Sequence, residues 1–480
     1  MIRKKEDGKL VFYIGDKEKK YLYYFFVVIS FIIVILATRK QFYDPDGFWH
    51  IKTGEWILKN KQIPTTDMFS WYGIKNNLTW INHEWIFEIL IYSIYKVFGL
   101  YGVMWSVAVI GGMIYLLIYK FTYIRSKNKL YSLFISMFSS LMIIPYISPR
   151  PQIISFTLLL TTCIFLEYKK WYYVLPVVVL EANFHGGFWP VFIIVISYYA
   201  YKEKPLLILL SILSIGINPN LFELFSYTFK NQSYSEGVKY IIESQRTIFA
   251  SEGNMNTLIV YFLLLLLLHN ARIKWQDGLM ALAFTGLTFL GERHVVFAYL
   301  IILPILGQYA QSSLAHSLHF IGSKLKAKFS TSIVYFLSCI IVFSVLTATA
   351  KYNIRNLKSD NVLINNFYPS NEVINYIKNN NLQNVMNFFN DGGYLIFNDV
   401  QTLIDGRGDP FSPQFNDTNI FKDYMEALHL NADYKEFMNK YNIENVLIPQ
   451  KSSLNHALKH DNSFTTLYKD EYYIIYKYNN

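Results

Sequence analysis

The sequence predicts an α-helical polytopic membrane protein with about eleven transmembrane helices and a C-terminal extracytoplasmic α/β domain. Hydrophobic residues make up 53% of its 480 residues, and charged residues only 16%. The hydrophobic residues gather in runs that are too long for the core helices of a soluble protein. Lys and Arg gather in short clusters between these runs, and the chain after residue 350 returns to a mixed polar pattern.

The positive charge is distributed as expected for a membrane protein. Much of the Lys and Arg behind the formal net charge of +10 lies between the apolar runs. The positive-inside rule explains this distribution, so we interpret the charge as a mark of membrane orientation and expect no nucleic-acid partner. Cys163 and Cys339 lie far apart in separate apolar runs, which predicts neither a disulfide nor a metal site at the cysteines.

A helix needs about 20 apolar residues to cross a bilayer, and this length defines the predicted spans. They are Tyr21–Thr38, Tyr101–Phe121, Leu130–Ile147, Gln152–Tyr168, Trp171–Ala182, Trp189–Tyr201, a span from Leu206, Met255–His269, Leu279–Leu290, Val295–Tyr309 and Ile333–Ala350. A Lys-rich segment precedes the first span, and no small-residue cleavage site follows that span. We therefore expect an uncleaved anchor with a cytoplasmic N-terminus.

Alternation of the spans assigns each loop to one side of the cytoplasmic membrane. It predicts a cytoplasmic tail at 1–20, a transmembrane domain at 21–350 and an extracytoplasmic α/β domain at 351–480. The first outer loop, 39–99, contains the apolar run Trp85–Phe98, which is too short to span a bilayer comfortably. We predict that this run forms an interfacial helix.

The C-terminal domain alternates between helix and strand patterns. The predicted helices are Asn371–Asn380 and Ile420–Tyr441, and the predicted strands are Asn384–Phe389, Gly392–Asn398, Gln401–Ile404, Ile443–Ile448 and a terminal hairpin of Phe464–Tyr468 with Tyr472–Tyr478. The most closely spaced group of charged residues in this domain is Asp405-Gly406-Arg407 with Asp409. They indicate either a turn with an internal ion pair or recognition of an acceptor.

Polar residues collect on the outer face of the predicted transmembrane domain. Directly after the first span the chain reads Asp44-Pro45-Asp46-Gly47-Phe48-Trp49-His50. Carboxylates beside a membrane are costly to desolvate, which favours a functional role for this motif. The candidate catalytic residues are Asp44, Asp46, His50 and Glu84, and the candidate substrate-binding residues are His83, Arg150, His185, Glu243, Arg293 and His294. Each alone is explained as a cap, a turn or a lipid-facing cation, but their shared face favours one site.

This order of features resembles the GT-C superfamily of membrane glycosyltransferases, such as protein O-mannosyltransferases and lipid A aminoarabinose transferases. Those enzymes also have an acidic motif after the first span, interfacial helices in the first outer loop and a soluble domain after the last span. The chain looks most similar to a bacterial branch whose short motifs stand here as Asp44–His50, Gly392–Leu395 and Asp405–Arg407. The resemblance covers nearly the whole chain, through motifs of moderate specificity.

The resemblance implies a polyprenyl-phosphate-linked sugar as donor, with membrane lipid around it, and a glycan, lipid or protein as acceptor. Transfer to a hydroxyl needs a carboxylate that removes or guides a proton. By resemblance this base is Asp44 or Asp46, with Asp44 preferred. A hydrogen bond from His50 or His83 is expected to orient it.

Cations must also stabilise the leaving phosphate. Arg150 and Arg293 are the candidates for this phosphate clamp, because a guanidinium matches phosphate oxygens bidentately. His185 and His294 are further donors.

No cofactor is assigned with certainty, and a divalent metal ion remains an open alternative. Suitable ligands are present on the outer face: Asp44, Asp46, His50, Glu84 and His185. Their spacing contains no HxxxH or HExxH pattern that would demand a metal.

Two functions fit these patterns. The first is a polyprenyl-phosphate-dependent glycosyltransferase that acts on the outer face of the cytoplasmic membrane of a bacterium. The second is a non-catalytic transporter or cell-envelope assembly protein that binds lipid-linked glycans. A transporter is expected to place ionisable groups in the middle of its spans, whereas most runs here are apolar at the centre, which favours the enzyme.

Overall fold

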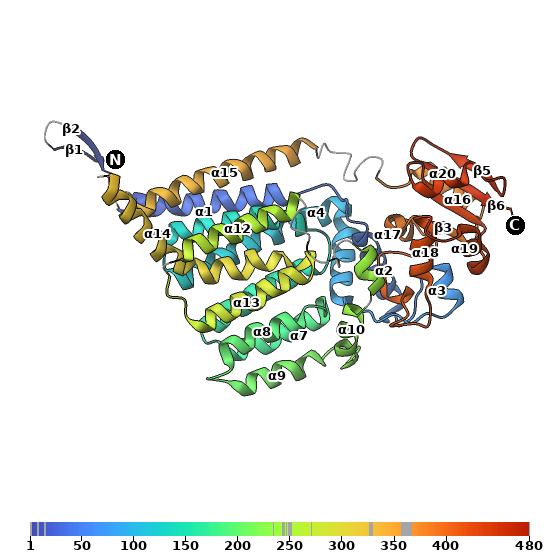
Figure 1. Cartoon of the computed structure of the whole chain (residues 1–480), viewed down its shortest axis with the longest axis horizontal. Helices are drawn as coiled ribbons and strands as arrows, with labels where there is room; N and C mark the ends of the chain where they lie inside the picture. Colours follow the sequence, from blue (N-terminus) through green and yellow to red (C-terminus); the bar gives the residue numbers. More distant parts are fainter. Residues whose placement is uncertain are drawn as a thin grey trace.

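A bundle of long helices carries a mixed helix and sheet segment at one end (Figure 1). The structure, a computed structural model, describes residues 2–6, 9–13, 16–233, 235–241, 245, 247, 252–269, 271–325, 330–356 and 367–479. The N-terminal strands β1 (Ile2–Glu6) and β2 (Lys9–Tyr13) form an antiparallel pair at the far end of the bundle.

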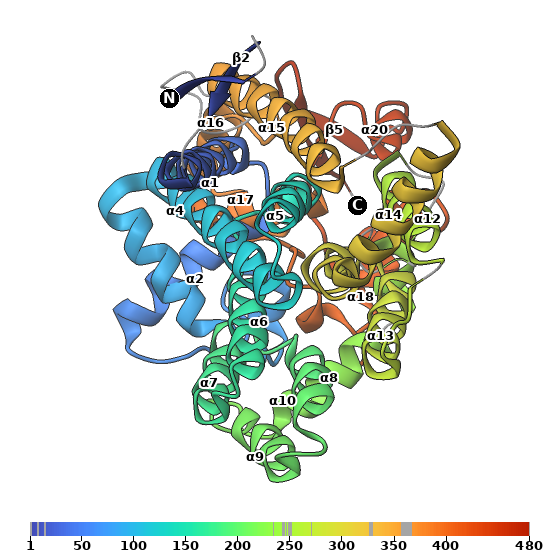
Figure 2. The same ribbon diagram turned by 90° about the vertical axis from the view of Figure 1, so that its left-hand side faces the viewer.

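Each predicted span overlaps a helix of the bundle, although Val295–Tyr309 covers the π-helix Ala298–Ile302 and only the start of α14. The bundle helices are α1 (Asp16–Thr38), α4 (Trp85–Ser126), α5 (Lys129–Ile143), α6 (Gln152–Glu167), α7 (Val174–Phe184), α8 (Trp189–Ala200), α9 (Pro205–Ile215), α12 (Glu252–Leu268), α13 (Trp275–Leu290), α14 (Leu303–Leu325) and α15 (Thr331–Asn356). Seen from the end, α12, α13 and α14 lie on one side of the bundle, and α1, α4 and α7 on the other (Figure 2). Among the described residues, five helical segments are long and apolar enough to cross a membrane, so the full count of about eleven spans stays a prediction.

Helix α4 joins the predicted interfacial helix to the second predicted span. The two parts are separated at Gly99, where φ is 64° and ψ is −169° inside an otherwise helical segment. Glycine adopts positive φ without a steric penalty, so it permits this change of direction. Helical structure over Trp85–Phe98 is thereby confirmed, while its position relative to a membrane stays a prediction.

Short helices line the end of the bundle that carries the C-terminal segment. They are α2 (Asp46–Asn60), α3 (Trp71–Lys75), α10 (Glu223–Gln232) and α11 (Ser235–Tyr240). The acidic motif starts α2: the Asp44 carboxylate accepts a hydrogen bond from the backbone N–H of Asp46 at 3.1 Å, and Pro45 precedes the first helical residue. α2 packs against α4 and places the motif at the base of the C-terminal segment.

The C-terminal segment contains a four-stranded sheet in the order β3-β4-β6-β5. Its elements are α16 (Asn371–Asn379), β3 (Val385–Asn387), α17 (Gly392–Phe397), α18 (Ile420–Leu428), α19 (Tyr434–Tyr441), β4 (Asn445–Pro449), α20 (Ser453–Leu458), β5 (Phe464–Lys469) and β6 (Tyr473–Tyr478). β3 and β4 are parallel, whereas β4 with β6 and β5 with β6 are antiparallel. The terminal hairpin is confirmed.

Three sequence predictions in this segment are wrong. Gly392–Asn398 forms helix α17 and no strand, because a short buried apolar run has no periodicity that separates the two. Gln401–Ile404 makes only an isolated bridge between Thr402 and Ser70. Ile420–Tyr441 divides into α18 and α19, because Asp433 caps a new helix by accepting from the backbone N–H of Lys435 at 2.8 Å.

The first loop and the C-terminal segment pack as one unit. The Trp71 side chain donates a hydrogen bond to the carbonyl of Val385 at 3.0 Å, and Trp71 shares a buried core with residues of α18. The guanidinium of Arg407 lies 2.7 Å from a carboxylate oxygen of Asp67 and 2.7 Å from one of Asp405, and all three side chains are buried. The predicted domain 351–480 therefore shares its core with part of the predicted loop 39–99.

We expect Asp67→Ala to lower the free energy of unfolding by about 3 kcal/mol, because it leaves part of the buried Arg407 charge uncompensated. Denaturant unfolding in detergent measures this change. The matched control is Glu203→Ala, which breaks the exposed pair of Lys169 and Glu203 at 2.7 Å. The control substitution should lower the free energy of unfolding by less than about 1 kcal/mol. Equal losses in the two variants would show that Asp67 does not join the loop to the C-terminal segment.

Candidate functional site

A cavity of about 680 Å³ lies between the end of the helical bundle and the C-terminal segment. Eight of the ten candidate residues line it: Asp46, His50, His83, Glu84, Arg150, His185, Arg293 and His294. Asp44 is buried and is not among the residues that line the cavity. Glu243 lies outside the described residues. The shared outer face predicted from the sequence thus corresponds to one cavity for the other eight.

Arg150 bridges the two carboxylates of the acidic motif. Its Nε atom lies 2.7 Å from Oδ2 of Asp44, and its Nη2 atom lies 2.9 Å from Oδ2 of Asp46. The other oxygen of Asp46 accepts a hydrogen bond from the indole N–H of Trp49 at 3.1 Å. Arg150 stands two residues before α6, so this contact ties the start of α2 to the start of α6. One guanidinium thus supplies the counter-charge of both carboxylates.

Glycines bring the three motifs of the sequence into direct contact. A Cβ atom on Gly393 would lie 2.0 Å from the carbonyl oxygen of Pro45, and one on Gly406 would lie 2.0 Å from Oδ1 of Asp46. A Cβ atom on Gly392 would also lie 2.6 Å from Cβ of Asp405. Any larger residue would push these segments apart, so close approach explains the glycines. The C-terminal segment therefore rests on the acidic motif itself.

Glu84 stands among three histidines on the cavity wall. Its carboxylate oxygens lie 3.7 Å from Nδ1 of His50, 3.7 Å from Nε2 of His83 and 3.8 Å from Nε2 of His185. Burial raises the pKa of Glu84 well above its usual range, and the nearby charge of Glu88 adds to the shift. Burial also lowers the pKa of His83 to about 4. Desolvation therefore disfavours charge on both kinds of group.

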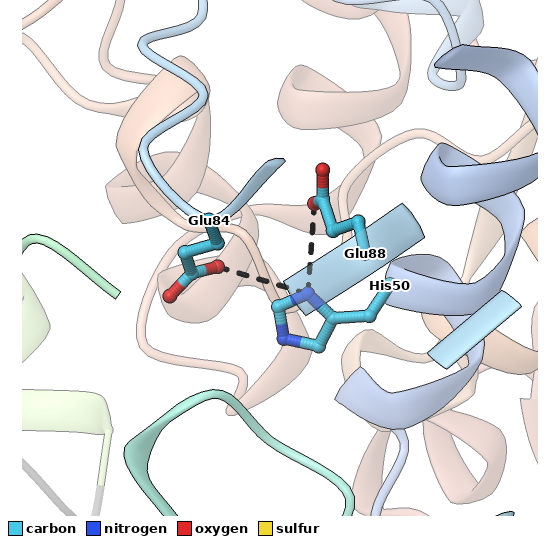
Figure 3. A group of neighbouring side chains, drawn as sticks. All are labelled: His50, Glu84 and Glu88. Atoms are coloured by element: carbon cyan, nitrogen blue, oxygen red, sulfur yellow. Dashed lines mark ion pairs between the residues drawn. The ribbon is translucent and has the colours of Figure 1, made fainter. Parts of the chain in front are cut away.

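The group of residues that could hold a metal ion is smaller than the group expected from the sequence, and its members differ. His50, Glu84 and Glu88 each offer one ligand atom, and these atoms lie within 4.8 Å of one another (Figure 3). Asp44 and Asp46 face Arg150 instead. The sequence analysis did not select Glu88 as a possible ligand. Its spacing of four residues from Glu84 places the two side chains on the same face of the helix, once the helix is known to begin at Trp85.

Arg293 brings positive charge to the cavity, and His294 lies beside it among the lining residues. They lie in a short 3-10 helix, Glu292–His294, directly after α13. Burial lowers the pKa of His185 well below its usual range, and the charges of Arg293 and Arg150 contribute to that shift. Both arginines therefore act electrostatically on the same cavity.

The C-terminal segment supplies the remaining wall. Arg407 lies over the rings of Trp80 and Phe69, with its guanidinium carbon 4.8 and 5.1 Å from the ring centroids. Its Nη1 atom has no hydrogen-bond partner among the described residues. Burial raises the pKa of Asp409 to about 8. Trp80 and Tyr227 also line the cavity and were missed, because aromatic residues are abundant throughout the chain and give no local signal.

Comparison with known proteins identifies the fold. No family model and no curated protein matches the sequence. One similar solved structure is the oligosaccharyltransferase AglB from Archaeoglobus fulgidus in complex with an inhibitory peptide and a dolichol-phosphate. It is 11% identical, with a TM-score of 0.58 over 96% of this chain and 74% of that chain. ArnT from Cupriavidus metallidurans, bound to undecaprenyl phosphate, is 10% identical with a TM-score of 0.51 over 96% of this chain and 98% of that chain.

Both solved proteins belong to the GT-C superfamily, which the sequence motifs also indicated. At 10 and 11% identity the similarity establishes the fold and not the substrates. The chain is a multi-pass membrane protein that shares the GT-C fold with these two solved proteins.

Proposed function

We propose that the protein is a glycosyltransferase that moves a sugar from a polyprenyl-phosphate donor to a glycan, lipid or protein acceptor. The observation that carries this proposal is the single cavity that joins the ion-paired Asp46 to Arg293 beneath the C-terminal segment. Such a transfer needs a fixed carboxylate near the acceptor and a cation near the leaving phosphate. Solved proteins of the same fold bind dolichol-phosphate and undecaprenyl phosphate, which supports this class of donor.

Asp46 takes the role of base in this proposal, in place of the Asp44 preferred from the sequence. Asp46 lines the cavity, whereas Asp44 is 5% exposed and does not line it. The Asp46 carboxylate is held at one oxygen by Trp49 and at the other by Arg150. It is thereby oriented to guide the proton of an acceptor hydroxyl.

Arg293 takes the role of phosphate-binding cation. Arg150 is engaged by two carboxylates, so its guanidinium is better suited to hold Asp46 than to clamp a phosphate. Arg293 lines the cavity from the α13 side, next to His294. A guanidinium there offers several donors to the oxygens of a leaving polyprenyl phosphate.

The acceptor is placed against the C-terminal wall. Arg407 and Asp409 offer a donor with an unfilled position and a carboxyl group that burial favours in its protonated form. Trp80 adds an aromatic face on which a sugar ring can stack. This combination suits a hydroxyl-rich acceptor.

The proposed orientation places the cavity on the outer face of the cytoplasmic membrane. α6 begins beside the cavity and ends before Lys169 and Lys170, and α8 ends before Lys202 and Lys204. These lysines lie at helix ends remote from the cavity, and the positive-inside rule assigns them to the cytoplasm.

Deletion of the protein from its host tests the proposal as a whole. Loss of the transferase should cause the unused polyprenyl-linked sugar to accumulate and one glycan, lipid or protein to lose that sugar. Mass spectrometry of the lipid extract and of the envelope glycans measures both. Unchanged lipid-linked sugar and glycan profiles would reject the transferase.

Asp46→Asn should lower transfer between about one hundredfold and ten thousandfold, because the amide cannot accept the proton. The measurement is the amount of modified acceptor in the deletion host that carries each variant at equal protein level. Asp44→Asn should lower transfer by a smaller factor, because Asp44 acts through Arg150. Asp399→Asn, at a 68% exposed side chain paired with Lys52, is the neutral control. Full activity of Asp46→Asn would exclude it as the base, and a greater loss in Asp44→Asn would return that role to Asp44.

Arg293→Gln should weaken binding of undecaprenyl phosphate about tenfold to a hundredfold, since a hydrogen-bonded charge on phosphate is lost. Native mass spectrometry or a titration in detergent measures the dissociation constant. Arg272→Gln removes one positive charge from an exposed position between α12 and α13 and should leave binding unchanged. Equal affinities of the wild type and Arg293→Gln would contradict the assigned role.

A further inference from the structure

A buried chain of hydrogen bonds connects His185 to two side chains that do not line the cavity. The Ser155 hydroxyl lies 2.9 Å from Nδ1 of His185 and 2.9 Å from Oε1 of Glu181. Ser155 belongs to α6, Glu181 belongs to α7, and His185 is the residue that ends α7. Of the three, His185 alone lines the cavity. Two neighbouring helices thus support one cavity residue from its Nδ1 side.

Packing does not explain Glu181. Its side chain is 1% exposed, and it lies within the predicted span Trp171–Ala182. Among the described residues no Lys or Arg forms an ion pair with it, and the one basic nitrogen close to its carboxylate is Nδ1 of His185, at 3.9 Å. Ionisable residues within a membrane-spanning segment are costly and usually serve a function. The contact with Ser155, and through it with His185, supplies one.

The directions of the hydrogen bonds fix which nitrogen of His185 carries the proton. A serine hydroxyl has one hydrogen to donate. Ser155 donates it to Oε1 of Glu181, so its oxygen is left to accept from Nδ1–H of His185. Burial lowers the pKa of His185 well below its usual range, so the neutral ring carries only that proton. Nε2 is therefore unprotonated and can only accept a hydrogen bond.

We propose that Glu181 and Ser155 are positioning residues that hold His185 with Nδ1 protonated, so that Nε2 accepts a hydrogen bond from a hydroxyl group of the donor sugar. The proposal rests on the proposed transferase function. His185 lies on the helical side of the cavity, together with Arg293, to which that function assigns the donor phosphate. Acceptance by Nε2 replaces the donor role that the sequence predicted for His185.

The surroundings of Nε2 suit a hydroxyl group. Nε2 lies 3.8 Å from Oε1 of Glu84, which is too long for a direct hydrogen bond. One hydroxyl oxygen can lie within about 2.7–2.9 Å of both atoms at that separation. Glu84 also lines the cavity, so a sugar bound there can reach this position. The ring of His185 is held from its other face side by Phe188, with ring centroids 4.7 Å apart.

Solid-state NMR of the whole protein in liposomes measures the protonated nitrogen without any activity assay. Isotope-labelled histidine gives separate signals for protonated and unprotonated Nδ1 and Nε2, and comparison with His185→Asn identifies those of His185. We expect a protonated Nδ1 and an unprotonated Nε2 in the wild type. Glu181→Leu should move the proton to Nε2, because the freed Ser155 hydroxyl can then donate to Nδ1.

Glu167→Leu is the matched control for this spectrum. It removes another glutamate of the helical bundle, at the end of α6, where Glu167 lies 2.6 Å from Arg125 and does not line the cavity. It should leave the signals of His185 unchanged. A protonated Nε2 in the wild type, or an unchanged proton position in Glu181→Leu, would overturn the proposal.

Steady-state transfer separates the positioning role from a merely structural one. The probe is the lipid-linked sugar that accumulates in the deletion host. Ser155→Ala should raise its KM about threefold to tenfold with little change in kcat, because His185 loses the contact that orients it. A structural defect would instead lower the amount of active enzyme, and therefore kcat, at unchanged KM. Ser211→Ala, at a buried serine of α9 that does not line the cavity, should change neither value.

The two measurements distinguish failure of this proposal from failure of the transferase. If no lipid-linked sugar accumulates in the deletion host, the transferase is rejected and the sugar contact with it, whatever the NMR spectrum shows. If the wild type transfers sugar and Ser155→Ala keeps the wild-type KM, the role of His185 is wrong and the transferase stands.

Discussion

The contact of Arg150 with Asp44 and Asp46 is the interaction on which the rest of the site depends. Two carboxylates at the end of a helical bundle repel each other and are costly to bury, and a single guanidinium between them offsets both effects. Because Arg150 precedes α6 and Asp46 begins α2, the same contact fixes two elements relative to each other. The position of Asp46 in the cavity follows from it.

The C-terminal segment builds on that fixed base. Its two glycine motifs approach the acidic motif closely, with Gly393 against the Pro45 carbonyl and Gly406 against the Asp46 carboxylate. The buried pair of Arg407 and Asp67 then holds the first loop to the same segment. The cavity is therefore an interface between two parts of the chain, with the acidic motif and Arg293 on the helical side and Arg407 and Asp409 on the other. This division suits a donor anchored in lipid and an acceptor that approaches from the aqueous side.

Periodicity and sidedness predicted the bundle well. Apolar runs of sufficient length mark helices directly, and alternation across a membrane was enough to group Arg150, His185 and Arg293, which lie far apart in sequence. Long-range pairing was not predictable in the same way. The sequence favoured Asp44 as base, but only the structure reveals that Asp46 lines the cavity and Asp44 does not.

The wrong prediction of secondary structure has a related physical origin. The run from Gly392 to Asn398 is buried along most of its length, so it has no periodicity by which to tell strand from helix. Glu88 was not counted among the possible metal ligands, because its neighbour His50 lies on a different helix. Local sequence patterns thus predicted most helices and the end of the bundle that carries the candidate site. Contacts between helices decide which side chains lie next to each carboxylate, and these contacts could not be predicted from the sequence.

A cryo-electron microscopy structure of the protein in lipid nanodiscs with undecaprenyl phosphate tests the central claim most directly. The account predicts phosphate density inside the cavity, within hydrogen-bond distance of Arg293, with Arg150 still bridging Asp44 and Asp46. Phosphate bound outside this cavity, or Arg150 released from both aspartates to hold the phosphate, would contradict it.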